Sequence, residues 1–115
     1  MTYKIKAPSH IDTTINLPAS KSISNRALIL HALSGGKELP QNLSDCDDTE
    51  VIINALRDMP PTIDIKAAGT AMRFMTAYLS VTPGEHTITG TERMRHRPIR
   101  VLVDALRTLG ADIQY

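Results

Sequence analysis

The spacing of apolar residues alternates between two periods along this 115-residue chain, and this alternation constrains its fold more than any other feature. A period of two is typical of a half-buried strand, whereas a period near 3.6 is typical of a helix with one buried face. The expected strands are residues 2–7, 13–17, 62–67, a short stretch within 82–90 and the residues from 111 onward; the expected helices are residues 22–34, 47–59, 68–80 and 98–109. This order of elements predicts a mixed α/β fold in which helices pack against sheets.

Residues at the expected helix ends support these limits. Glycine readily adopts the left-handed conformation that closes a helix, so the first helix should stop at residues 34–36. Asp47 or Asp48 is expected to cap the second helix, because a short acidic side chain accepts hydrogen bonds from free backbone N–H groups. Pro98 suits the first position of the last helix, and Gly110 suits the position just after its end. The first helix is apolar on nearly all sides and is therefore expected to be buried.

The composition argues against several classes of partner. With three Tyr, one Phe and no Trp, the chain has little of the aromatic surface on which single-stranded nucleic acids stack. Its formal net charge of +1 lacks the basic excess typical of duplex binding. Cys46 is its single cysteine, so the chain forms neither an internal disulfide nor a cysteine-based zinc site, and a reducing, cytoplasmic location is expected. No apolar run is long enough to span a bilayer, so no membrane partner is expected.

Three of the expected helices begin with cations, where the positive end of the helix dipole makes cations unfavourable. The residues of interest at these starts are Lys21, Ser22 and Arg26 in the first helix, Gly69 and Arg73 in the third, and Arg97 just ahead of the fourth. Each mismatch costs roughly 0.3–1 kcal/mol when exposed, and a bound phosphate or carboxylate would reverse its sign. Gly69 lets a ligand approach the backbone closely, and Arg97 offers a planar fork for an oxyanion. The pattern predicts an anion-binding site.

Each of these clusters also has an ordinary structural interpretation. Serines at a helix start often only cap the helix, with Lys21 as a solvated neighbour. The arginines between residues 93 and 100 are equally consistent with a solvated charged face. The four histidines show no spacing typical of a metal site, and the acidic residues 45–48 fit a helix cap better than a calcium loop. Neither a Walker loop nor the G-x-G-x-x-G pattern is present, so no nucleotide site is expected.

Three stretches resemble motifs of one enzyme family, the 5-enolpyruvylshikimate-3-phosphate synthases. They are LPASKSISNRALILHAL (17–33), AAGTAMRFMTAYLS (67–80) and GTERMRHRPIRVLVDALRTLGADI (90–113). The resemblance implies an α/β fold of repeated βαβαββ units, an inside-out α/β barrel, in a two-domain enzyme that binds its substrates between the domains. Residues 1–17 would then be a strand segment belonging with a missing C-terminal domain, and residues 18–115 a partial N-terminal substrate-binding domain. Because a strand at the very end of the chain would leave an open sheet edge, we expect the chain to be truncated.

The family transfers the enolpyruvyl group of phosphoenolpyruvate to the 5-hydroxyl of shikimate 3-phosphate in the shikimate pathway. It releases phosphate through a tetrahedral intermediate and uses no metal or organic cofactor. By this resemblance Ser22 and Arg26 would hold shikimate 3-phosphate, while the Gly69 backbone and Arg97 would hold phosphoenolpyruvate. Lys21 would contact both substrates, and Lys21 and Arg97 would be catalytic because they align and neutralise two anions that repel each other.

The resemblance further implies that the acid–base carboxylates of the reaction lie in the later half of the family's chains. It implies small-molecule substrates as the only partners, with neither nucleic acid nor membrane, and a monomer in the cytoplasm at full length. The segment 1–115 is expected to be inactive alone, because it would carry only part of the site.

Two other interpretations stay open. The transferase that acts on UDP-N-acetylglucosamine shares the fold, but it usually carries a Lys-Asn pair where this chain has Lys21 and Ser22. The chain is also compatible with a non-catalytic anion-binding module. Within the second motif, Ala67 stands where many members have Asn, and Phe74 stands where Pro is frequent. By the resemblance, Ala67 removes an amide near the pyruvyl site, and Phe74 lies in a helix whose start helps to shape the family's inhibitor-binding region.

Overall fold

The computed structural model of the protein describes all 115 residues and contains five helices and two strands. In chain order they are α1 (Lys21–Leu33), α2 (Asp47–Asp58), β1 (Thr62–Asp64), α3 (Gly69–Leu79), β2 (Thr87–Thr89), α4 (Glu92–Arg95) and α5 (Arg100–Thr108). The mixed α/β character expected from the apolar spacing is confirmed. None of the helices combines the length and the apolar composition needed to cross a bilayer.

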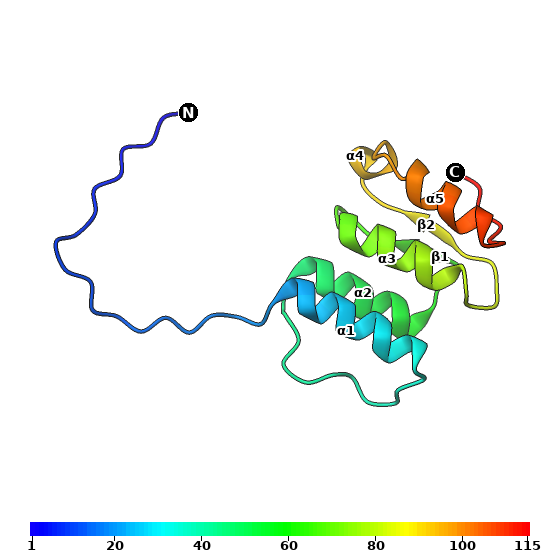
Figure 1. The fold of residues 1–115 in the computed structure, drawn as a ribbon, viewed down its shortest axis with the longest axis horizontal. Coiled ribbons are helices and arrows are strands. Elements are labelled where there is room, and N and C mark those ends of the chain that lie inside the picture. Colours follow the sequence, from blue (N-terminus) through cyan, green and yellow to red (C-terminus); the bar gives the residue numbers. More distant parts are fainter.

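A parallel pair of strands joined through α3 forms the centre of the fold. Ile63 of β1 pairs with Ile88 of β2, and α3 provides the crossover between the two strands. In Figure 1, helices α1, α2, α3 and α5 all begin on the left side of the folded body, where β1 and β2 end. The positive ends of the four longest helices and the carboxyl ends of both strands therefore lie on one side of the molecule, where open α/β folds commonly bind ligands.

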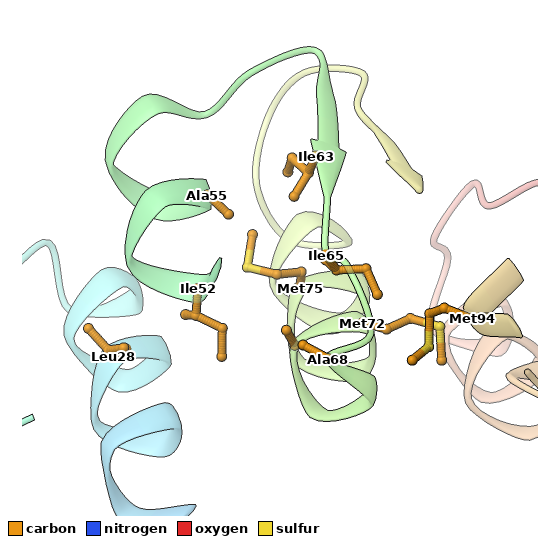
Figure 2. Close-up of a cluster of buried hydrophobic side chains, with 10 residues drawn as sticks. Leu28, Ile52, Ala55, Ile63, Ile65, Ala68, Met72, Met75 and Met94 are labelled. Atoms are coloured by element: carbon orange, nitrogen blue, oxygen red, sulfur yellow. The ribbon is translucent and has the colours of Figure 1, made fainter. Parts of the chain in front are cut away.

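The hydrophobic core lies between α2, α3 and β1 and reaches α1 and α4 at its two ends. Its buried residues are Leu28, Ile52, Ala55, Ile63, Ile65, Ala68, Ala71, Met72, Met75 and Met94. Figure 2 shows Ala55 of α2, Ile63 of β1 and Met75 of α3 directed into the same space between these three elements. Because α3 contacts both α1 and α2 and carries three of these buried side chains, its N-terminal end is held firmly relative to the rest of the fold.

The strands expected at both ends of the chain do not form. Residues 1–19 are extended, run away from the folded body (Figure 1), and leave Ile5 91% and Leu17 83% exposed. The residues from Ala111 onward also contain no strand. A strand exists only when a neighbouring strand accepts and donates its backbone hydrogen bonds, and these segments have no such neighbour in this chain. Both terminal segments have the alternating apolar pattern of a strand, but neither has a neighbouring strand to pair with.

The expected burial of the first helix is wrong. Only Ser24, Asn25 and Leu28 of α1 are buried, while Ile23 is 70% and Leu30 is 67% exposed. Helices α2 and α3 cover one side of α1, and no element of this chain covers the other. An apolar sequence supplies a helix with surfaces that can be buried, but the rest of the fold decides which of them are.

Two expected helix starts are corrected, and one expected helix end is confirmed. Cys46, rather than Asp47 or Asp48, is the N-cap of α2, and the two aspartates lie in its first turn. The last helix begins at Arg100 instead of Pro98, because Ile99 has a non-helical φ of −129°. Gly110 has a φ of +99°, the left-handed conformation expected just after a helix end.

Candidate functional site

The guanidinium of Arg97 covers the first residue of α3. Gly69 is buried, and a methyl group built on its α carbon would lie only 2.8 Å from Cζ of Arg97. Neither a capping side chain nor an acidic residue occupies the first turn of α3. The start of this helix therefore offers unpaired backbone N–H groups and a positive dipole end beside a guanidinium, which together suit an oxyanion.

Arg73 ties together the two segments that meet at this point. Its Nη1 donates a hydrogen bond to the carbonyl oxygen of Gly69 at 3.1 Å, and its Nη2 donates one to the carbonyl oxygen of Pro98 at 3.4 Å. Arg97 and Pro98 are adjacent, so this bridge holds the Arg97 segment against the start of α3. The sequence pattern placed Arg73 at this helix start but did not indicate that it bridges two carbonyls.

Lys21, at the first position of α1, forms an ion pair with Asp48 in the first turn of α2. The Nζ–Oδ2 distance is 3.2 Å, and the two side chains are 48% and 24% exposed. Such an exposed pair contributes little to stability, so the Lys21 ammonium can exchange Asp48 for an anionic ligand at small cost. Asp48 was expected only as a cap, and its role as the partner of Lys21 could not be deduced from the sequence.

Ser22 and Arg26 lie on one face of α1, as their spacing predicted. Nη1 of Arg26 donates to the carbonyl oxygen of Ser22 at 2.9 Å, and its Cζ lies 5.6 Å from the centroid of the Phe74 ring on α3. Both side chains are exposed, and the Ser22 hydroxyl makes no hydrogen bond within the chain. The remaining guanidinium N–H groups of Arg26 and the Ser22 hydroxyl are available to a ligand.

A shallow cavity of about 420 Å³ lies between the first half of α2 and the segment just ahead of α3. Asp48, the partner of Lys21, lines it on the α2 side, and Ala68, which precedes Gly69, lines it on the other side. The expected residues thus form two groups, one at the start of α1 and one at the start of α3. No hydrogen bond or ion pair joins Arg97 to Lys21, Ser22 or Arg26.

The thiol of Cys46, the N-cap residue of α2, has a pKa that differs from its usual value. Burial acts to raise the pKa of the Cys46 thiol, but hydrogen bonding with the side chains of Ser44 and Thr49 holds that pKa below its usual value.

No group of three or more His, Cys, Asp or Glu side chains lies close enough together to hold a metal ion. The helix starts present ammonium, guanidinium, hydroxyl and backbone N–H donors, which are suited to binding and orienting anions.

Comparison with known proteins gives one consistent result. Residues 5–64 and 59–115 match the family model described as EPSP synthase (3-phosphoshikimate 1-carboxyvinyltransferase). The chain is 70% identical over 115 residues to the 3-phosphoshikimate 1-carboxyvinyltransferase of Bacteroides fragilis, covering all of this chain and 28% of that protein. It is 41% identical over 133 residues to the protein of that name from Shewanella loihica, covering 93% of this chain and 31% of that protein. The chain therefore spans less than a third of the length of these relatives.

Proposed function

Because this chain belongs to the EPSP synthase (3-phosphoshikimate 1-carboxyvinyltransferase) family, we propose that it supplies one part of the active site of an enolpyruvyl transferase. The complete protein transfers the enolpyruvyl group of phosphoenolpyruvate to the 5-hydroxyl of shikimate 3-phosphate and releases phosphate. The contact between Arg97 and Gly69 at the open start of α3 carries this proposal, since it places a guanidinium and free N–H groups side by side.

Phosphoenolpyruvate is assigned to the start of α3. Its negative charges face the free N–H groups of the first turn, and the planar fork of Arg97 binds one of its oxyanions through two parallel hydrogen bonds. Because Gly69 has no side chain, the Arg97 guanidinium can lie against the start of α3, next to these N–H groups. These donors are already in place before the ligand arrives, so they stabilise its charge without reorganisation.

Shikimate 3-phosphate is assigned to α1. The Ser22 hydroxyl and the free N–H groups of Arg26 bind it, and the stacking of Arg26 on Phe74 keeps that guanidinium in place. Lys21 lies between the two substrates and exchanges its contact with Asp48 for contacts with their oxygens. Two anions that repel each other are thereby aligned for attack of the 5-hydroxyl on the enolpyruvyl carbon. The proton transfers of the addition and elimination steps are assigned to residues beyond this chain.

The wider architecture of the complete protein is part of the same proposal. Residues 18–115 form part of an N-terminal substrate-binding domain in a two-domain, inside-out α/β barrel, and residues 1–17 pair as a strand with the other domain. The exposed apolar side chains of the extended segment 1–19 support this assignment. The complete protein acts as a cytoplasmic monomer on small molecules, without a nucleic acid or membrane partner.

The direct test measures phosphate release and enolpyruvyl product formation by the full-length protein with phosphoenolpyruvate and either shikimate 3-phosphate or UDP-N-acetylglucosamine. Turnover is expected with shikimate 3-phosphate only. Arg97→Ala should lower kcat/KM roughly 100- to 1,000-fold, the usual effect of losing one preorganised charge-stabilising donor. Arg93→Ala is the matched control, because Arg93 lies on α4, is also exposed and should not affect kcat/KM. The proposal would be refuted if the protein used UDP-N-acetylglucosamine but not shikimate 3-phosphate, or if it showed no turnover with either acceptor.

A further inference from the structure

A cluster of four buried polar residues joins α1 to the beginning of α2. Its members and their exposed fractions are Ser24 (3%), Asn25 (0%), Ser44 (7%) and Thr49 (0%). The backbone N–H of Ser44 donates to Oγ of Ser24 at 2.8 Å, and Oγ1 of Thr49 donates to Oδ1 of Asn25 at 2.7 Å. These two bonds cross between segments 20 or more residues apart, so they connect separate elements.

Stability alone does not account for this cluster. Nδ2 of Asn25 is buried and has no hydrogen-bond partner, so the side chain loses its hydration without full replacement. A leucine and a valine of similar shape would fill the same space between the two helices without that penalty. Hydrogen bonds differ from apolar contacts in being directional, and a directional bond selects one register of α1 against α2.

The cluster adjoins Lys21 and Asp48, which lie at the starts of the same two helices. Asn25 is one helical turn after Lys21 on α1, and Thr49 immediately follows Asp48 on α2. The bond between Thr49 and Asn25 and the ion pair between Lys21 and Asp48 therefore join the same turns of the same two helices. The ion pair is half exposed and exchanges with solvent, so it cannot by itself hold α1 in position.

We propose that Asn25 and Thr49 are positioning residues: their buried hydrogen bond sets the register of α1 on α2 and thereby places Lys21 for the two substrates. This inference rests on the proposed function, because Lys21 must contact substrate for its placement to matter. A shift of α1 by about 1 Å is enough to lower a rate roughly 100-fold when the shifted group aligns the reactants.

The test is the double substitution Asn25→Leu/Thr49→Val in the full-length protein. Tm should stay the same or rise, because the unpaired amide is gone, whereas kcat/KM should fall about 10- to 100-fold. Thr76→Val is the matched control. It removes another buried hydroxyl, but that hydroxyl bonds only to the Met72 carbonyl within α3, so activity should be unchanged.

A double-mutant cycle with Lys21→Ala separates positioning from general damage. If Asn25 and Thr49 act through Lys21, the double substitution should cost much less activity when Lys21 is already alanine. Full additivity of the two effects, or wild-type kcat/KM in the double variant, would overturn the inference. Thr49→Ser keeps the hydroxyl and should retain most activity, and it provides the comparison if the double variant does not fold.

A crystal structure of the double variant tests the inference without relying on activity. We expect α1 to shift along α2 and the Lys21 Nζ–Asp48 Oδ2 distance to exceed its present 3.2 Å. An unchanged position of α1 would overturn the positioning role even if the protein proves to be a different transferase. Absence of turnover in the unsubstituted protein would instead refute the proposed function. The position of α1 in the double variant would then still show whether Asn25 and Thr49 set the register of α1 on α2.

Discussion

The Arg97 guanidinium occupies the space where a side chain on Gly69 would lie, with its Cζ only 2.8 Å from the position of that side chain's first carbon. The two residues come from different segments, and the Arg73 bridge holds these segments together. Because the contact depends on the absence of a side chain at residue 69, the site is sensitive to single-atom changes there.

Substitution of Gly69 by alanine should displace Arg97 and crowd the start of α3. In the full-length protein we expect KM for phosphoenolpyruvate to rise at least about tenfold, while KM for shikimate 3-phosphate changes little. Steady-state kinetics with each substrate varied in turn measure both constants in one preparation. Equal effects on the two constants would place Gly69 outside the phosphoenolpyruvate site.

The bridge made by Arg73 should require its planar guanidinium. A lysine carries all its donors on one nitrogen, whereas Arg73 reaches the carbonyl oxygens of Gly69 and Pro98 with two separate nitrogens, so Arg73→Lys should loosen the Arg97 segment. We expect kcat/KM for phosphoenolpyruvate to fall about tenfold, close to 1.4 kcal/mol. Arg57→Lys is the control, because Arg57 bonds only to Asn54 and Asp58 of its own helix. Wild-type kinetics for Arg73→Lys would contradict the bridging role.

Loss of the Lys21 ammonium should lower activity strongly while changing the stability of the fold little. Lys21→Ala removes only a half-exposed ion pair, so the free energy of unfolding should change by less than about 1 kcal/mol. Activity should nevertheless fall by orders of magnitude, since Lys21 contacts both substrates in the proposed site. Chemical denaturation and steady-state kinetics test the two halves of this prediction. Lys37→Ala, at an exposed loop position, should leave both measurements unchanged.

Asp64 should contribute a pH-dependent part of the stability. The Lys66 backbone N–H, which donates to Oδ1 of Asp64 at 2.9 Å, and then the Lys66 ammonium hold the pKa of this carboxyl below its usual value of 3.8. A carboxyl whose pKa is lowered by folding stabilises the folded state above its unfolded-state pKa and loses that contribution as pH falls through the folded-state pKa. Asp64→Asn should therefore be less stable than the wild type at pH 7, and the difference should vanish at strongly acidic pH. A difference that stays constant across this range would show that the ionised carboxylate is not responsible.

Local sequence patterns were sufficient to predict the principal helices and the central strand. The period near 3.6 and the glycine and proline positions predicted α1, α2 and α3 to within about two residues at each end. The strand expected at 62–67 forms over its first half, as β1 (Thr62–Asp64). These elements depend on neighbouring residues, so a short window of sequence contains the information they need. The cations at the helix starts could also be identified from short windows of sequence.

The partners of those residues were decided by the tertiary structure. Asp48 meets Lys21, Arg97 meets Gly69, and Thr49 meets Asn25 across segments that are far apart in the chain. The period of residues 2–7 and 13–17 resembled a strand, yet no strand forms there, because a strand requires hydrogen bonds from a neighbour. The sequence by itself determined approximately where α1, α2 and α3 lie and which helix starts carry cations, since these features depend on neighbouring residues. Only the packing of α1, α2 and α3 determined which side chains meet at those starts, because contacts between distant segments depend on the whole fold.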